Sequence, residues 1–187
     1  MKLAVFFPGI GYTVDKPLMY YGRRIAANHG YEIKLLPYAG FPGKVIGDRD
    51  IMEESFRIAW CQSKEMLSDT DFSNYGEILL VGKSIGTIVA AQMAEKSSVR
   101  EKTRLILYTP LEKTFDYSFE NAVAFTGLAD PWVGKKDSRI PMLCKQREIE
   151  CHLIKGANHS LETGDVRKDL RNMQMIMTET EKFVAGV

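Results

Sequence analysis

Short apolar runs alternate along the chain with segments whose apolar residues recur every three or four positions. The runs are residues 2–7, 31–36, 78–81, 104–108, 121–126 and 149–154. Apolar runs of this length, bounded by turn residues, are typical of strands, whereas the three- and four-residue spacing is typical of amphipathic helices. The last run partly alternates apolar and polar residues, which favours a strand at the edge of a sheet. Strands that alternate with helices predict a parallel sheet covered on both faces, because each parallel link has to cross over.

Two helices are predicted in the first third of the chain. Pro17 begins the first helix, in which Leu18, Tyr21 and Ile25 share a face. Asp48 is placed to cap the second helix. The expected buried stripe of the second helix is Met52, Phe56, Ala59, Trp60 and Leu67. The aromatic residues of this stripe are expected in the core and not around a ligand.

Two further helices are predicted near the end of the chain. Asp137 is placed to cap a short helix that runs through Met142 and Lys145. The last helix is expected to start near Thr163 or Asp165. Its expected buried stripe is Val166, Leu170, Met173 and Met177.

Composition and charge narrow the choice of partners. The chain has 187 residues, a usual length for one domain, so we expect a single domain over residues 1–187. Its 25 Lys and Arg residues nearly balance 24 Asp and Glu residues and form no basic block, so binding to nucleic acid is not expected. The apolar start before Pro8 is too short for a signal peptide or a membrane span. These features predict a cytoplasmic protein that binds small molecules and no membrane. They carry no signal for the oligomeric state.

The cysteines give no sign of a disulfide framework or a metal site. The chain has an odd number of cysteines, namely Cys61, Cys144 and Cys151. They show no C-x-x-C spacing and no neighbouring histidine cluster. We therefore expect reduced thiols, and neither a metal nor an organic cofactor.

A glycine-flanked serine follows the apolar run 78–81 directly. Gly82-Lys83-Ser84-Ile85-Gly86 fits the pattern G-x-S-x-G, in which a serine sits on a tight turn between a strand and a helix. A phosphate-binding loop would need a glycine at position 77, which is Glu, and a flexible loop where the chain has an apolar run. A third interpretation is that Ser84 only caps the helix that follows. The pentapeptide alone does not decide between a nucleophile and a cap.

An acid and a histidine follow the last two predicted strands. Asp130 lies just after the run 121–126, and His159 lies just after the run 149–154. Because parallel strands end at one edge of a sheet, both residues are expected near Ser84. A serine needs a base to take its proton, and the base needs a carboxylate to hold its tautomer. Asp130 before Pro131 is also a common turn pair, and His29 and His152 lie away from strand ends and are expected to be structural.

The order Ser84, Asp130, His159 resembles that of the α/β-hydrolase superfamily, in a small form without a cap, over essentially the whole chain. The resemblance rests on Gly82-Lys83-Ser84-Ile85-Gly86, on Gly127-Leu-Ala-Asp130 and on Gly156-Ala-Asn-His159. It also rests on Pro8-Gly9-Ile10-Gly11, where the family often has His-Gly, so Pro8 departs from the usual pattern. The resemblance implies a three-layer α/β/α fold with a mostly parallel six-stranded sheet in the order 2-1-3-4-5-6.

The expected activity is a serine hydrolase that cleaves a small carboxylic ester or thioester through an acyl-enzyme on Ser84. His159 would act as the base, oriented by Asp130, and the amides of Ile85 and Ile10 would form the oxyanion hole. An acyltransferase with the same residues, or a binding protein that has lost turnover, are the alternatives. Lys83 is expected to be a solvated surface lysine. Side chains that could ring the mouth of the site, or else cover core edges, are Tyr12, Leu111, Phe115, Tyr117, Phe119 and Trp132.

Overall fold

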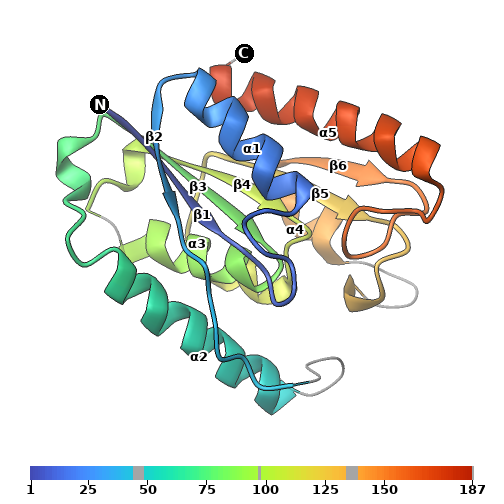
Figure 1. The fold of residues 1–187 in the computed structure, drawn as a ribbon, viewed down its shortest axis with the longest axis horizontal. Coiled ribbons are helices and arrows are strands. Elements are labelled where there is room, and N and C mark those ends of the chain that lie inside the picture. The colour runs from blue at the N-terminus through green and yellow to red at the C-terminus, as the bar shows by residue number, and fades with distance from the viewer. Residues whose placement is uncertain (44–48, 97, 134–138, 187) are drawn as a thin grey trace.

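A six-stranded sheet lies at the centre of the computed structural model, which describes residues 1–43, 49–96, 98–133 and 139–186 (Figure 1). The strands are β1 (Lys2–Phe7), β2 (Tyr31–Leu35), β3 (Glu77–Lys83), β4 (Thr103–Tyr108), β5 (Ala122–Gly127) and β6 (Glu150–Ile154). Every neighbouring pair of strands is parallel. The order β2-β1-β3-β4-β5-β6 is the predicted one, with the partly alternating strand β6 at an edge.

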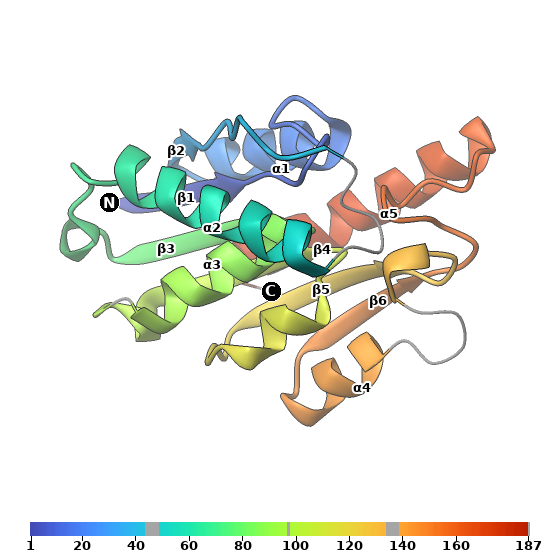
Figure 2. The same ribbon diagram turned by 90° about the horizontal axis from the view of Figure 1, so that it is seen from below.

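Helices cover both faces of the sheet and make three layers (Figure 2). One face carries α1 (Pro17–Asn28) and α5 (Val166–Ala185), and the other carries α2 (Arg49–Met66), α3 (Ile85–Lys96) and α4 (Arg139–Gln146). Four short 3₁₀ turns complete the described elements: η1 (Phe72–Asn74), η2 (Arg100–Lys102), η3 (Glu112–Asp116) and η4 (Pro131–Val133). The fold class predicted from the alternation of strands and helices is therefore confirmed.

The two faces of the sheet bury separate apolar clusters. Along β1, Leu3, Val5 and Phe7 face the α2 and α3 side, and Ala4 and Phe6 face the α1 and α5 side. All five are fully buried, which is why this strand reads as a continuous apolar run. Full burial of one large apolar side chain stabilises the fold by roughly 1.5–3 kcal/mol.

The buried face of α1 differs from the predicted one. Tyr21 is 49% exposed, and the helix instead turns Leu18, Met19, Gly22 and Ala26 to the sheet. The small residues let the helix approach large rings. A Cβ atom at Gly22 would already lie 3.5 Å from the Phe6 ring and from the Tyr108 hydroxyl. Tyr21 is too large for that face.

The buried face of α5 is also shifted from the predicted one. Val166 and Leu170 are 72% and 67% exposed, whereas Ile176, Thr180 and Val184 are buried. Figure 1 shows the reason, since the amino-terminal end of α5 extends past the tips of the strands and has no sheet beneath it. Asp165 caps this helix, and its side chain accepts hydrogen bonds from the amides of Arg167 and Lys168. The cap is therefore at Asp165, one of the two starts that the sequence predicted. Met173 and Met177 pack against the cluster as expected.

Several predictions of detail can also be placed. The caps Asp48 and Asp137 lie outside the described residues. The second helix keeps most of its stripe, with Ala59 and Leu67 buried and Phe56 and Trp60 packed against the core. Met52 was wrongly placed in this stripe, since it is partly buried and lines a cavity. Cys61, Cys144 and Cys151 are free thiols. Within the described part of the chain, no helix is both long and apolar enough to cross a membrane.

Candidate active site

Ser84 lies on a sharp turn between β3 and α3. Its φ of 54° is in the left-handed region that residues with side chains rarely adopt. The turn is held on both sides, because the Ser84 amide donates to the Tyr108 carbonyl at 3.0 Å and the Ser84 carbonyl accepts from the Thr87 amide at 2.9 Å. The Thr87 hydroxyl donates to the same carbonyl at 2.6 Å. These bonds keep the serine in a strained backbone conformation.

The flanking glycines are required by the space around this turn. A Cβ atom at Gly82 would lie 2.6 Å from the Thr87 Cα, and one at Gly86 would lie 1.9 Å from the Phe7 carbonyl oxygen. Real Cβ atoms do not approach backbone so closely. The turn can therefore form only with glycine on each side of the Lys83-Ser84-Ile85 segment, as the G-x-S-x-G pattern predicts.

Ser84, His159 and Asp130 form one chain of hydrogen bonds. The Ser84 Oγ lies 2.7 Å from His159 Nε2, and His159 Nδ1 lies 2.6 Å from Asp130 Oδ2. The other carboxylate oxygen, Asp130 Oδ1, accepts from the Trp132 amide at 2.9 Å. A carboxylate at Nδ1 keeps the proton on that nitrogen, so Nε2 is free to accept the Ser84 proton. The three side chains that the sequence predicted to meet do so.

The loops that carry the acid and the histidine are bonded to each other. Leu128 and Ala129 donate their amides to the carbonyls of Ile154 and Ala157, at 3.0 and 2.9 Å. Gly127 makes this approach possible, because a Cβ atom there would lie 2.3 Å from the Ala157 carbonyl oxygen. The Asn158 side chain closes its own turn by accepting from the amides that follow His159, those of Ser160 and Glu162. These contacts fix the separation of Asp130 and His159.

Burial and charge set the state of the histidine. Its side chain is 19% exposed and that of Asp130 is fully buried. Burial lowers the pKa of His159 below its ordinary value, the hydrogen bond to Asp130 opposes this, and the positive charge of Lys83 adds to the lowering. His159 is therefore neutral at pH 7 and able to act as a base. The Trp132 ring lies 5.6 Å from the imidazole and covers one side of it.

Lys83 is buried, and its prediction as a solvated surface lysine was wrong. It is 1% exposed at the end of β3. Leu79 and Val81 of the same strand belong to the cluster under α1 and α5, and the period of two puts Lys83 on that face as well. Its Nζ lies 4.9 Å from the centre of the Tyr12 ring. A charged residue type gave no sign of this burial in the sequence.

The two amides predicted for an oxyanion hole are available in the described part of the chain. The Ile85 amide is at the first residue of α3 and has no intrahelical acceptor. The Ile10 amide takes no part in the pair of hydrogen bonds that closes the turn, which join Gly9 and Tyr12. Neither amide donates to another backbone group of the described residues. Both can therefore donate to a bound group.

A cavity of about 770 Å³ opens directly onto the Ser84–His159 pair. The described residues that line it are Ile10, Gly11, Tyr38, Ala39, Gly40, Phe41, Pro42, Gly43, Met52, Ser84, Trp132 and His159. Among these, no Lys, Arg, Asp or Glu is present. The wall is mostly apolar and aromatic, and Ser84 and His159 are hydrogen-bonded to each other within it. The cavity therefore suits an uncharged organic group.

One wall of the cavity, the segment 38–43, is clamped to helix α2. The Gln62 amide group both donates to the Ala39 carbonyl and accepts from the Ala39 amide, at 2.8 and 3.1 Å. The Tyr38 hydroxyl lies 2.6 Å from that of Ser63. The two prolines and three glycines of residues 37–47 predict a loop, but its role in the site was not predicted. Its sign was its position, since it follows β2 and so starts at the same sheet edge as the other site loops.

The candidates for the mouth of the site divide between lining and core. Trp132 lines the cavity. Phe115 and Phe119 belong to the core under α2 and α3, and Tyr12 is buried under α1. Leu111 and Tyr117 are partly buried and are not among the described lining residues. Trp132 is thus the one candidate of the six that the described part of the cavity uses.

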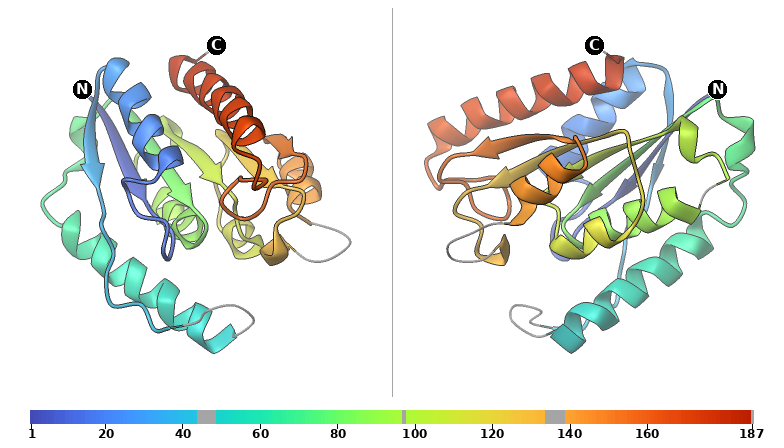
Figure 3. Two further views of the ribbon diagram at one scale, coloured as in Figure 1. Left: turned by 45° about the vertical axis from the view of Figure 1, so that its right-hand side comes forward. Right: turned by 180° about the vertical axis from the view of Figure 1, so that it is seen from behind.

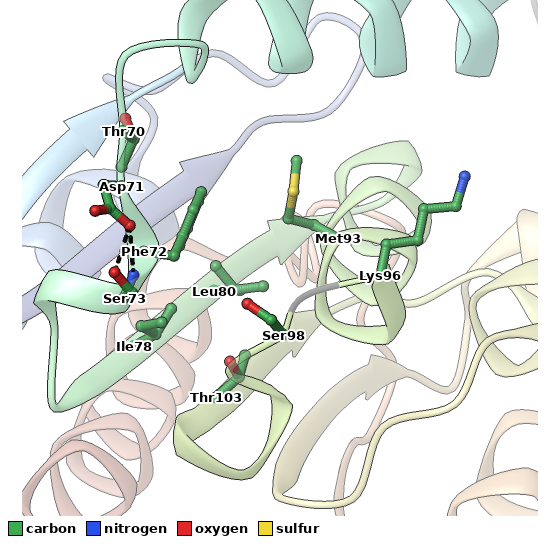
Figure 4. A pocket seen from close by; sticks show the side chains of 10 residues that line it. All are labelled: Thr70, Asp71, Phe72, Ser73, Ile78, Leu80, Met93, Lys96, Ser98 and Thr103. Atoms are coloured by element: carbon green, nitrogen blue, oxygen red, sulfur yellow. Dashed lines mark hydrogen bonds between the residues drawn. The ribbon is translucent and has the colours of Figure 1, made fainter.

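A second hollow lies at the other end of the sheet and is smaller, about 280 Å³ (Figure 4). It is bordered by the start of β3 at Ile78 and Leu80, the start of β4 at Thr103, and the segment around Phe72. Its lining includes no histidine and no cysteine among the described residues. The described lining of this hollow therefore lacks the hydrogen-bonded serine and histidine found in the cavity at Ser84.

One group of described residues has the ligand types of a metal site. The ligand atoms of Glu150, His152 and Glu179 lie within 4.8 Å of one another, between β6 and α5. His152 already lies 3.3 Å from the Glu150 carboxylate, and Glu179 is paired with Lys182 at 2.9 Å. These contacts with neighbouring side chains account for the group. His29 is similarly paired with Glu181, so neither histidine predicted to be structural joins Ser84.

Comparison with known proteins identifies the fold. No protein-family profile and no curated protein sequence matches the chain. Its structure is similar to an esterase of Pyrococcus furiosus, with a TM-score of 0.68, 12% identity and coverage of 98% of this chain and 82% of that one. It is also similar to Est1E of Butyrivibrio proteoclasticus with ferulic acid bound, with a TM-score of 0.65, 13% identity and coverage of 100% of this chain and 89% of that one. A third similar structure is a serine hydrolase without lid from Xanthomonas campestris, with a TM-score of 0.54, 15% identity and coverage of 95% of this chain and 79% of that one. At such low identity these likenesses establish the fold alone.

Proposed function

Because the chain has the α/β-hydrolase fold, we propose that it is a serine hydrolase that cleaves a small carboxylic ester or thioester. The observation that carries this proposal is the hydrogen-bonded chain from Ser84 through His159 to Asp130. The chain of bonds ends in the wall of an apolar cavity large enough for an acyl group. A strained serine on a tight turn, a neutral imidazole and a buried carboxylate are the parts that such a reaction needs.

In the first half of the proposed reaction, Ser84 becomes acylated. Its Oγ attacks the carbonyl carbon while its proton passes to His159 Nε2, giving a tetrahedral oxyanion and an imidazolium. The oxyanion collapses, the bond to the leaving oxygen or sulfur breaks, and the imidazolium gives its proton to the departing alcohol or thiol. Asp130 stabilises the imidazolium through Nδ1.

In the second half, water releases the acyl group. His159 takes a proton from water as its oxygen attacks the acyl carbon, and a second tetrahedral oxyanion forms. When this collapses, the bond to the Ser84 Oγ breaks and the serine regains its proton from the imidazolium. The products are a carboxylic acid and the free enzyme.

The oxyanions need hydrogen-bond donors, and the proposed donors are the amides of Ile85 and Ile10. Ile85 lies at the start of α3, where the helix dipole also favours negative charge. Ile10 lines the cavity on the opposite loop. Loss of one such donor typically lowers kcat by about 100- to 1000-fold.

The lining of the cavity supports an uncharged acyl group as the substrate. Phe41, Trp132 and Met52 offer apolar contact, and no Lys, Arg, Asp or Glu stands among the described lining residues. Lys83 lies beneath the turn and is not one of these residues, so it gives no basis for an anionic substrate.

The test is to treat the protein with a fluorophosphonate probe and with p-nitrophenyl acetate. The parent should be labelled and should release p-nitrophenol. Ser84→Ala should not be labelled, and its kcat should fall by about 10⁴-fold or more. Ser160→Ala is the matched control, because Ser160 lies beside His159 but its hydroxyl bonds to none of the described residues. Labelling and full activity in Ser84→Ala would rule out the proposal.

A further inference from the structure

Lys83 is the buried ionisable group nearest in sequence to the proposed nucleophile, and the proposed mechanism does not use it. It immediately precedes Ser84 and is 1% exposed. Among the residues that the structure describes, its amino group has no hydrogen-bond partner and no salt-bridge partner. Its amino group lies over the ring of Tyr12, 4.9 Å from the ring centre. An amine in such a place cannot be explained as a surface charge.

Two of the proposed catalytic residues are electrostatic neighbours of Lys83. Asp130 and His159 both interact with it electrostatically. Other titratable side chains on the elements packed around it are Tyr12, Tyr108 and Glu162. Burial raises the pKa of Tyr12 to about 12 and also raises that of Tyr108, so both phenols are neutral at pH 7. Glu162 interacts with Tyr12, whereas the electrostatic partners of Lys83 are Asp130 and His159.

We propose that Lys83 is a positioning residue whose buried amino group, held on the Tyr12 ring one residue before Ser84, sets the proton affinity of His159. The proposal rests on the proposed function for its catalytic meaning. A positive charge on Lys83 opposes the imidazolium that the reaction has to form, whereas a neutral amine leaves the Asp130 charge free to stabilise it.

The amine can change its charge in the range where hydrolysis is expected to run. Burial lowers the pKa of Lys83 to about 7, and the nearby Asp130 charge opposes part of that lowering. Above this pH the amine is neutral and the imidazolium forms more readily. Below it the amine is charged and holds the pKa of His159 down.

The first test measures the proton affinity of His159 directly and needs no substrate. The chain has three histidines, so a histidine-labelled sample gives three titration curves by NMR. In Lys83→Met, which removes the charge and keeps the length, the pKa of His159 should rise by about 0.5–1 unit. His29 and His152 should titrate as in the parent and serve as internal controls. Lys155→Met, which removes an exposed charge on the loop leading to His159, should change none of the three curves.

The second test uses the rate. The acid limb of kcat/KM should move to higher pH in Lys83→Met by the same amount as the pKa of His159. An unchanged His159 titration in a folded Lys83→Met protein would overturn the proposal, whatever the activity. If the hydrolase activity did not depend on Ser84, the proposed function would be wrong instead. The NMR result on Lys83 and His159 would still stand.

A third measurement covers the case in which Lys83→Met does not fold. In the parent, lysine-labelled NMR should show one amine that titrates near pH 7, in step with a change in the His159 signals. If every lysine titrated above about pH 9.5, close to the ordinary value, the proposal would be wrong.

Discussion

At the scale of single residues, the buried amine of Lys83 makes stability depend on pH. Burial lowers the pKa of Lys83 to about 7 in the folded protein, whereas an unfolded lysine titrates near 10.4. Between these values the unfolded chain binds a proton that the folded chain does not. Raising the pH through this range therefore favours folding, and the destabilisation by Lys83 is fully present at and below pH 7.

We predict that Lys83→Met is more stable than the parent at pH 7, on the order of 1 to 3 kcal/mol. The advantage should shrink steadily as the pH rises toward 10, because the parent loses its penalty there. Urea unfolding at pH 6, 7, 8.5 and 10 measures the difference. Lys155→Met, at an exposed site, should show no such trend. A stability difference that is constant from pH 7 to 10 would contradict the assigned burial effect.

The sequence predicted which residues meet at the candidate site better than it predicted their environment. Ser84, Asp130 and His159 could be found because each follows a separate apolar run, and parallel strands bring their ends together. The burial of Lys83 could not be predicted in this way, because the sequence around a lysine does not show whether a distant loop will cover it. Tyr12, which covers it, comes from a different part of the chain.

At the scale of elements, the turn between β3 and α3 depends on close backbone contact. We predict that Gly86→Ala destabilises the protein by about 3 kcal/mol or more, because its Cβ atom would lie 1.9 Å from the Phe7 carbonyl oxygen. Any protein that still folds should have moved Ser84, and a shift of about 1 Å lowers kcat by roughly 100-fold. Thermal unfolding and the rate of p-nitrophenyl acetate cleavage measure the two effects.

The control for Gly86→Ala is a glycine that has a positive φ but no close neighbour where a Cβ atom would lie. Gly30 follows His29, the C-cap of α1, with a φ of 80°, and a Cβ atom there would meet nothing within 4 Å. Gly30→Ala should destabilise by only about 1–2 kcal/mol and leave kcat unchanged. Equal losses of stability in the two variants would show that crowding at the turn does not matter.

The elements themselves follow from the sequence more closely than their buried faces do. The strand order and the start of α5 at Asp165 are as predicted. The face of α1 was wrong at Tyr21, because close packing on the Phe6 ring and the Tyr108 hydroxyl favours small residues that carry little hydrophobic signal. The face of α5 was wrong at Val166 and Leu170, because periodicity gives no information on where the sheet beneath a helix ends.

At the scale of the whole molecule, the cavity is made by loops that meet only after folding. Its wall takes residues from the loop after β1, the segment 38–43 after β2, helix α2 and the turn at Trp132. The course of the strands and helices that carry these loops can be followed in Figure 3. Each piece appears in the sequence as an ordinary loop or helix face. Their common edge is predictable from the parallel sheet, but the clamp of Gln62 on Ala39, which sets the position of one wall, is not.

That wall gives the last prediction, which concerns the choice of acyl group. Phe41 lines a cavity of about 770 Å³, which is large for a short acyl chain, so its ring supplies contact for longer chains and does not exclude them. In Phe41→Ala, the kcat/KM ratio of p-nitrophenyl hexanoate to acetate should fall about 10-fold. Phe72→Ala, which truncates a ring at the smaller hollow, should leave the ratio unchanged. A higher ratio in Phe41→Ala would mean that the ring limits chain length and that longer acyl groups are not held against this wall.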